Sequence, residues 1–398
     1  MKKVLLGLSF SICLLSAVTI DELVKNTNEH NYDLKSIDKS IGIANYQILL
    51  SKKWQNPMLS IGLNDLWIND LTTRDKEAMQ ASFIGFSQVI PTGSKLEIKE
   101  KIAQKDRNIQ ILNLEDKKLE LESKIYEYVY TILLLEKKYE LLESYEQNIT
   151  KLEKLFTSLY KYQKASLNEI LNTQISALDI DLQKQNLKNM IDNFYLKLEQ
   201  ITYTKIDKIN ENINIKKINL LDINNDHPKF KSLEEMSNKS KNMALFESEK
   251  KIPDLTLNVA YFQRDEKFND YVNVSVSFPL PIYNTENTAR LQANMNMNEI
   301  NDNLEQLKHN FKIQSEILKN TTNNSYENYK LIEEKIIPIK EKIQENIETY
   351  NSFDKIKPQE SIKNLNELIV YETKAIDELQ KYYEAYSQLI YFTNKGII

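Results

Sequence analysis

The chain has 398 residues, with 52 Lys and Arg against 57 Asp and Glu, one Cys, 6 Gly and 8 Pro. This composition excludes a disordered chain, a disulfide-stabilised scaffold and a collagen-like repeat, and the net charge of −5 gives no general reason to expect nucleic-acid binding. Neither Gly nor Pro, the residues that most often interrupt helices, occurs between Ser94 and His227. The sequence therefore predicts long amphipathic helices.

The first 17 residues have the order of a secretory signal peptide. Lys2 and Lys3 precede an apolar stretch that ends at Ala17, and acidic residues follow soon after it. We expect cleavage near Ala17. The apolar stretch is shorter than the ~20 residues that span a bilayer, which argues against an uncleaved anchor helix. Because Cys13 is the only cysteine, we expect the mature protein to lack thiol chemistry.

Two segments of the chain are echoed in its second half. Residues 56–63 resemble residues 252–259, and residues 86–91 resemble residues 276–281. We therefore predict two structural repeats of helix, strand, strand, long helix and helix, joined by a connector over 204–226. The first repeat covers 18–203, with strands at about 57–68 and 80–91 and long helices at about 94–160 and 166–203. The second covers 227–398, with strands at about 253–263 and 270–281 and long helices at about 285–353 and 360–395.

The predicted strands alternate between apolar and polar residues, as strands do when one face meets a core or lipid. Their length, about 9 to 11 residues, suits a strand that crosses a bilayer in a barrel. Four strands are too few to close a barrel, so a membrane role requires several copies of the chain, whereas a small soluble sheet with one face on a core remains the alternative. The positions expected to face lipid are Leu59, Ile61, Leu63, Leu255, Leu257, Val259, Val272, Val274, Val276 and Phe278.

The predicted helices carry apolar residues at alternating three- and four-residue spacing. Two such stripes run along the helix that begins after Ser94, so this helix needs neighbours on two sides and we expect the chain to form oligomers. A helix of this length would extend on the order of 100 Å at ~1.5 Å per residue. Pro338 should kink the long helix of the second repeat, and Glu372 occupies one position of an otherwise apolar stripe.

The signal peptide, the two repeats and the Pro residues at the strand ends together resemble the TolC-like outer-membrane efflux protein family. The segments that carry the resemblance are Gly85–Gly93, Tyr271–Pro281 and the helical turns near Tyr160–Leu171 and Tyr350–Leu365, and it extends over essentially the whole mature chain. It implies a mainly α fold with a small membrane β-barrel portion. In that fold, three copies each give four strands to one barrel in the outer membrane of a Gram-negative bacterium, and their helices form a duct in the periplasm.

The resemblance also implies a function. The chain would be the passive exit duct of a tripartite efflux system, with a periplasmic adaptor (membrane fusion) protein and an inner-membrane pump of the resistance-nodulation-division or ABC type as partners. Two alternatives stay open: a type I secretion duct for proteins or peptides, and a soluble periplasmic coiled-coil adaptor or structural protein.

The predicted helical turns differ from the family pattern, because they lack the usual turn glycine. Lys363 and Asn366 also stand where the best-studied members carry an acidic ring. The residues that the resemblance assigns to a periplasmic aperture, or that lie near it, are Glu169, Tyr350, Glu360, Lys363 and Asn366.

Residues suited to catalysis are scarce. The only histidines, His30, His227 and His309, are far apart in the sequence, and no Gly-rich phosphate-binding loop is present. We therefore predict that the protein is not an enzyme and that it has no cofactor, no metal site and no nucleic-acid partner.

Overall fold

The computed structural model describes residues 17–219, 224–351 and 358–393. The predicted signal peptide, apart from Ala17, and residues 352–357 of the second helical turn therefore lie outside the described residues. The chain forms two compact units. The first contains the segments up to Lys35, Asp116–Asn225 and from His309 onward, and the second contains Ser36–Glu115 and Asp226–Lys308. Each unit thus combines segments from both halves of the sequence.

Long helices dominate the chain, as the lack of Gly and Pro predicts. The first two helices begin at side chains that accept hydrogen bonds from free backbone N–H groups. Thr19 and Glu22 form a capping box at the first helix, and the Asn31 side chain accepts hydrogen bonds from the backbone N–H groups of Asp33 and Leu34 at the second. The helices are α1 (Ile20–His30), α2 (Tyr32–Ser51), α3 (Lys95–Lys161), α4 (Leu167–Thr202), α5 (Pro228–Glu249), α6 (Thr285–Leu331), α7 (Ile337–Asn351) and α8 (Pro358–Phe392).

The predicted helix over 285–353 is not one continuous α-helix. A π-helical segment, η1 (Ile332–Ile336), separates α6 from α7. Pro338 follows it closely and has no N–H to donate to the carbonyl of Glu334, and the N–H of Ile337 bonds to the carbonyl of Ile332 instead. The predicted interruption at Pro338 therefore takes the form of a π-helical turn placed just before the proline.

A cluster of tyrosines holds the connector against the core of the first unit. The rings of Tyr130 and Tyr383 stack with their centroids 3.8 Å apart. The hydroxyl of Tyr383 donates to the carbonyl of Asn214 at 2.7 Å, and that of Tyr382 donates to the carbonyl of Lys216 at 2.9 Å. The connector is therefore fixed by hydrogen bonds as well as by apolar burial, and its buried residues are Ile206, Ile209 and Ile218.

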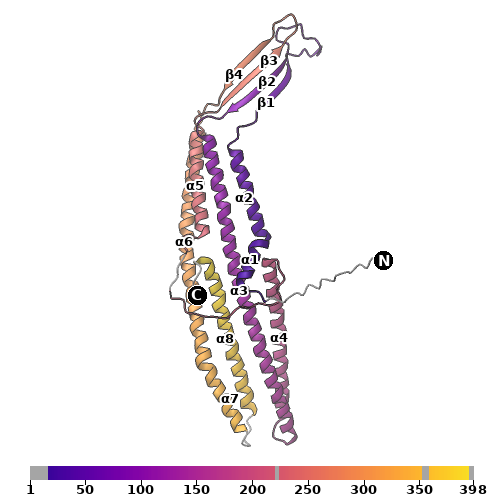
Figure 1. The fold of residues 1–398 in the computed structure, drawn as a ribbon, viewed down its shortest axis with the longest axis vertical. Coiled ribbons are helices and arrows are strands. Elements are labelled where there is room, and N and C mark those ends of the chain that lie inside the picture. The colour runs from indigo at the N-terminus through magenta and orange to yellow at the C-terminus, as the bar shows by residue number, and fades with distance from the viewer. Residues whose placement is uncertain (1–16, 220–223, 352–357, 394–398) are drawn as a thin grey trace, which may run out of the picture. The chain divides into compact units, whose positions relative to one another are not determined.

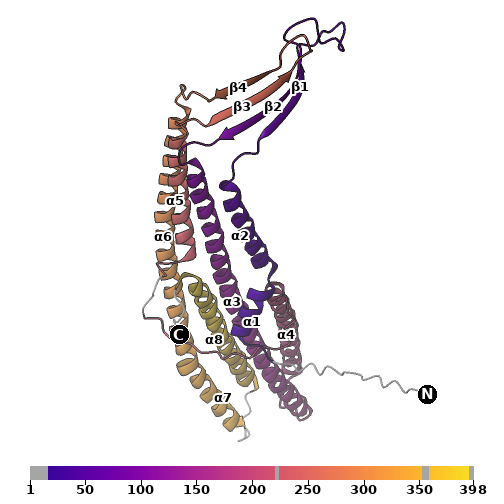
Figure 2. The same ribbon diagram turned by 45° about the horizontal axis from the view of Figure 1, so that its top comes forward.

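The second unit contains a four-stranded antiparallel sheet (Figures 1 and 2). Its strands are β1 (Met58–Asn64), β2 (Ala81–Ile90), β3 (Leu255–Gln263) and β4 (Tyr271–Ser277), in the order β1-β2-β3-β4. The central pair, β2 and β3, joins the two halves of the sequence. Each half therefore contributes one hairpin to a shared sheet.

The turn between β2 and α3 is tied to the segment that leads into β3. The backbone N–H of Thr92 donates to the carboxylate of Asp254 at 2.9 Å, and the ammonium group of Lys95 pairs with the same carboxylate at 2.5 Å. Gly93 has a φ of +66°, a conformation that side chains other than Gly rarely adopt. An added Cβ would also lie 2.8 Å from a carboxylate oxygen of Glu249, so the end of that side chain would have to move.

Candidate functional site

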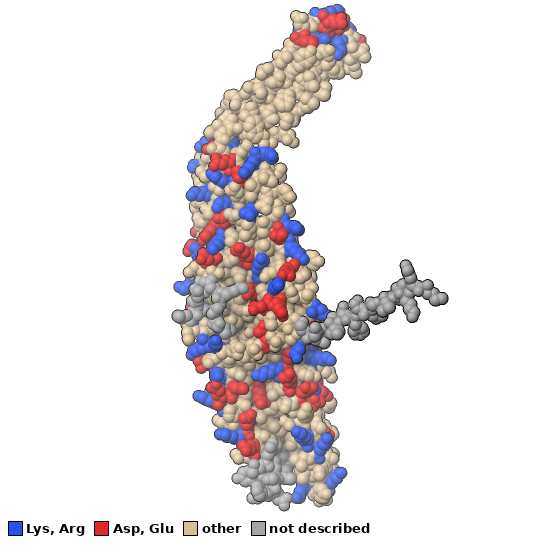
Figure 3. Space-filling model, in the orientation of Figure 1, with Lys and Arg blue, Asp and Glu red and all other residues tan. Residues whose placement is uncertain are grey.

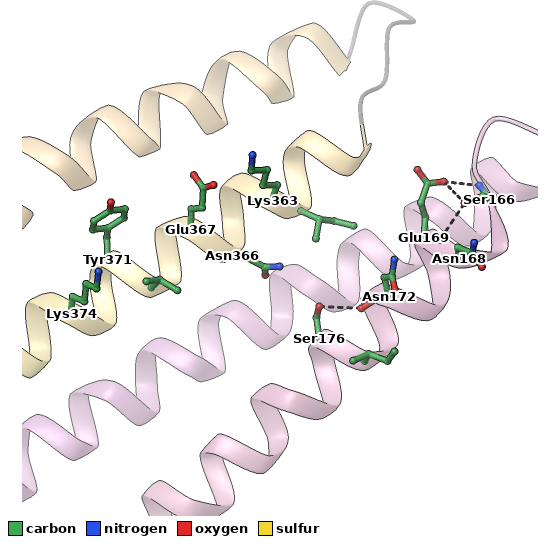
Figure 4. Close-up of a pocket in the computed structure, with 13 residues that line it drawn as sticks. Ser166, Asn168, Glu169, Asn172, Ser176, Lys363, Asn366, Glu367, Tyr371 and Lys374 are labelled. Carbon is green, nitrogen blue, oxygen red and sulfur yellow. Dashed lines mark hydrogen bonds between the residues drawn. The ribbon is translucent and has the colours of Figure 1, made fainter.

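A hollow of about 1020 Å³ lies in the first unit between the N-terminal parts of α4 and α8 (Figure 4). We call it the α4–α8 groove. Most of its side chains are polar, and both acidic and basic groups are present. Its lining residues are Ser166, Asn168, Glu169, Asn172, Ile175, Ser176, Ile362, Lys363, Asn366, Glu367, Val370, Tyr371 and Lys374.

Glu169 has a structural role at the start of α4. Its carboxylate accepts a hydrogen bond from the backbone N–H of Ser166 at 2.6 Å, while the Ser166 hydroxyl accepts one from the N–H of Glu169. This reciprocal pair is a capping box, which the sequence signals as Ser-x-x-Glu before an apolar run. That signal was available in the sequence, but it predicts a helix start rather than a gate.

The turn before α4 forms without the glycine that the family pattern places there. Gln163 adopts the left-handed conformation, with a φ of +57°. The turn is closed by hydrogen bonds from the N–H groups of Gln163 and Lys164 to the carbonyls of Tyr160 and Leu159. A non-glycine residue in this conformation costs about 1 to 2 kcal/mol, so the surrounding turn must compensate for it.

Both acidic side chains of the groove have partners, whereas its two lysines form no ion pair among the described residues. Glu367 pairs with Lys340, and the hydrogen bond and charge of Lys340 lower the pKa of Glu367. Lys363 and Lys374 form no ion pair with the residues that the structure describes, and the Lys374 ammonium lies 5.2 Å from the centroid of the Tyr371 ring. The groove therefore offers two cations to a partner or a solute.

Three of the five predicted aperture residues meet in this groove. Glu169 comes from α4, and Lys363 and Asn366 come from α8. Glu360 is exposed on the first turn of α8 and does not line the groove. Tyr350 belongs to α7, but its side chain lies outside the described residues. That these residues surround an aperture stays a prediction.

Glu372 forms a second polar site, which the sequence signals only as a charge within an apolar stripe. One of its carboxylate oxygens is buried and has no hydrogen-bond partner among the described residues. Burial raises the pKa of Glu372, and the charges of Glu341 and Glu333 raise it further, against the opposing effect of a hydrogen bond with Tyr145. Part of a hollow of about 380 Å³ is lined by the three carboxylates. The site therefore stabilises the protonated form of Glu372 relative to an exposed carboxyl group.

Apolar residues predominate on one face of the sheet in the second unit, and we call it the apolar face. The strand register places Ile61 opposite Ile84, Phe86 opposite Val259, and Val259 opposite Val274. The nine predicted lipid-facing residues that lie within strands all belong to this face, and Phe278 directly follows β4. Ile61 is 75% exposed and Val274 is 66% exposed. That this face meets lipid stays a prediction.

None of the helices within the described residues is both long enough and apolar enough to span a membrane. Over residues 17–219, 224–351 and 358–393, no group of three or more His, Cys, Asp or Glu side chains is placed to hold a metal ion.

Most of the chain is similar in fold to bacterial outer-membrane proteins of known structure. The Campylobacter jejuni CmeC outer membrane channel matches with a TM-score of 0.74 at 13% identity, over 95% of this chain and 87% of that one. The Vibrio cholerae outer membrane protein VceC matches with a TM-score of 0.77 at 9% identity, over 95% and 97% of the two chains. The Neisseria gonorrhoeae MtrE outer membrane channel matches with a TM-score of 0.76 at 9% identity, over 94% and 88%.

No protein-family model matches the chain, and no curated protein matches it by sequence. The likeness is therefore one of fold, and it extends over almost the entire chain. The predicted fold class, mainly helical with a small antiparallel sheet, is confirmed.

Proposed function

We propose that the protein is the outer-membrane channel of a tripartite efflux system in a Gram-negative bacterium. It would act as a passive exit duct that receives substrates from an inner-membrane pump and a periplasmic adaptor protein and releases them outside the cell. On this proposal the chain performs no catalysis, and the pump supplies the energy. The alternatives of a type I secretion duct and a periplasmic adaptor have no specific observation in their favour.

The observation that carries the proposal is the apolar face of the sheet within a fold of this kind. Ile61 and Val274 are mostly exposed. On this proposal, lipid covers them. The chain is similar, over 94% or more of its length, to outer-membrane channels. In water, an exposed apolar sheet face would promote aggregation. In a membrane, the same face would contact the lipid chains.

We further propose that the working unit is a homotrimer that shares one barrel. The edge strands β1 and β4 each pair with only one neighbour among the described residues, so each leaves a row of backbone groups for another copy. In the first unit, α4 exposes an apolar stripe with four- and three-residue spacing, which a neighbouring helix would bury. Its members are Leu171, Ile175, Leu178 and Leu182, all between 46% and 67% exposed.

The α4–α8 groove is our candidate for the periplasmic aperture. Lys363 and Asn366 lie in it together with Glu169, and Glu360 and Tyr350 belong to neighbouring helical turns. Because Glu169 is engaged in capping α4, Lys363 is the charged residue among these three that remains to act on a passing solute. An aperture of this kind would carry a basic rather than an acidic character.

Outer-membrane fractionation of the native protein, followed by chemical cross-linking and size analysis in detergent, tests the proposal. A trimer that requires detergent and is found in the outer membrane would support it, whereas a monomer or dimer extracted without detergent would contradict it. Deletion of the gene then separates the two kinds of duct. Increased drug or metal sensitivity would indicate efflux, and loss of a secreted protein with unchanged sensitivity would indicate type I secretion.

A further inference from the structure

The sheet has a second face, which we call the polar face, and it contains one row of aromatic residues. The register places Gly62 opposite Phe83, Phe83 opposite Phe262, and Phe262 opposite Tyr271. Since directly opposed residues point to the same side, these four positions form one row across all four strands. The alternation puts this row on the side opposite Ile61.

The three rings of this row contact one another. Phe262 and Tyr271 stack with their centroids 4.7 Å apart and an angle of 3° between the rings, and Phe83 lies 5.4 Å from Phe262. Phe83 extends over Gly62, because a Cβ at that glycine would lie 2.6 Å from the Phe83 ring. The aromatic surface therefore reaches from β4 to β1, and glycine at position 62 leaves the space that it needs.

The rings have a row of short, uncharged side chains beside them. The adjacent row consists of Ser60, Gly85, Ala260 and Asn273, so the rings stand beside a row of short side chains. None of the four strands contains Lys, Arg, Asp or Glu. Figure 3 shows the same pattern on one face of the molecule, where charged residues gather at the strand loops and are absent from the sheet itself.

The Tyr271 end of the row is already occupied by a cation of the protein. The guanidinium group of Arg264 lies 5.0 Å from the centroid of the Tyr271 ring and is held by hydrogen bonds to the carbonyls of Asn269 and Ala78. Arg264 therefore already makes the cation–π interaction that a cationic solute could otherwise make with this ring. Phe83 and Phe262 have no such contact with a described Lys or Arg.

From this row we propose that the polar face holds a binding site for uncharged planar aromatic solutes, formed by Phe83, Phe262 and Tyr271. The inference rests on the proposed channel function, in which the polar face lines the pathway. The rings stand beside a row of short side chains, so an aromatic solute can pack against the ring edges. Aromatic pairs contribute binding free energy in addition to that of the buried area. The absence of charge on the strands leaves nothing there to retain an ion, so aromatic character is the property by which this lining selects.

Cross-strand packing within the sheet is the simpler role of these rings, and the control variant separates the two roles. Phe86 is an aromatic residue on the same strand as Phe83, but it lies on the apolar face and is 46% exposed. Replacing either residue with Leu keeps an apolar side chain of similar size, which cores and sheets tolerate. Only the Phe83 change alters the polar face.

The experiment records ion currents through the purified protein in planar bilayers, with 1-naphthol added to the side of the strand loops. We expect 1-naphthol to reduce the current at lower concentration than its saturated analogue, decahydro-1-naphthol. In the double variant Phe83→Leu, Phe262→Leu, the half-blocking concentration should rise about fivefold or more, because two aromatic contacts are lost. The variant Phe86→Leu should behave like the unmodified protein.

Equal block by the two compounds, or equal block of the double variant and the unmodified protein, would overturn the inference while leaving the channel function intact. If the unmodified protein forms no channel in the bilayer, the proposed function fails and the inference fails with it. Should the double variant not assemble, the single variant Phe262→Leu provides the same comparison, with an expected rise of about twofold or more.

Discussion

Val274 offers the most direct test of which face of the sheet meets lipid. It lies at the centre of β4, opposite Val259 at the centre of β3, and 66% of its surface is exposed. Its substitution Val274→Lys adds a charge without removing a buried contact. If the apolar face meets lipid, this charge would lie near the middle of the bilayer.

The expected cost follows from the position and from the number of copies. A Lys at the midplane on the lipid face of a barrel costs about 2 to 4 kcal/mol. Three copies in a trimer would add up to about 6 to 12 kcal/mol, if the sites act independently. That sum is similar to the ~5–15 kcal/mol by which a typical domain is stable. We therefore expect Val274→Lys to abolish most of the assembled trimer.

The assay compares the amount of cross-linked trimer in the outer-membrane fraction for Val274→Lys and for Asn273→Lys. Asn273 is the preceding residue of the same strand and belongs to the polar face. It is also exposed. The Asn273 variant should assemble normally because its charge would face water. Equal trimer yields for the two variants, or a greater loss for Asn273→Lys, would refute the assignment of the faces.

Three further predictions concern the helices and turns. Because the pKa of Glu372 is raised, the folded state binds its proton more tightly than the unfolded state does, and stability should fall as the pH rises from about 4.5 through the raised pKa. Burial also raises the pKa of Glu127 and Glu136, so Glu372→Gln should make this fall smaller in urea unfolding measured at several pH values, and an unchanged fall would contradict the assignment. Gly93→Ala should lower stability by about 1 to 2 kcal/mol in thermal unfolding, because Gly93 has a positive φ. Gly42→Ala should raise stability by about 0.5 to 1 kcal/mol, because an added Cβ there has no atom within 4 Å. Similar effects of the two substitutions would contradict the strain argument. Ser166→Ala should cost about 1 kcal/mol and speed hydrogen exchange in the first turn of α4, while unchanged exchange would show that the cap contributes little.

The sheet was largely predictable from the sequence because its strands alternate with a period of two. Leu59, Ile61 and Leu63 could be assigned to one face without any structure. The second strand was the exception, since Phe83 and Ile84 are adjacent and apolar. Only the register with β1 and β3 assigns Ile84 to the apolar face and Phe83 to the polar face. The aromatic row therefore needed the pairing of strands that are far apart in the chain.

The helical site was less predictable, because its residues depend on how helices pack rather than on local spacing. Glu169 and Lys363 lie on different helices, and nothing in the sequence near either residue specifies that they share a groove. Glu372 was visible as a charge in an apolar stripe, yet its approach to Glu341 and Glu333 depends on the packing of α7 and η1 against α8. Pro338 signalled an interruption, but not that the change would be a π-helical turn placed before it.

The two faces of the sheet differ in what determines their composition. If the apolar face meets lipid as proposed, it needs only to be apolar, because lipid makes no demand on the shape of Ile61 or Val274. On the polar face, small uncharged residues suffice for a wetted surface, and three aromatic rings in a single row exceed that need. Gly62 lies in the edge strand β1 beneath the ring of Phe83, and a ring packed over glycine compensates a strand for the missing side chain. Phe262 and Tyr271 oppose no glycine, so this compensation accounts for Phe83 but not for the rest of the row.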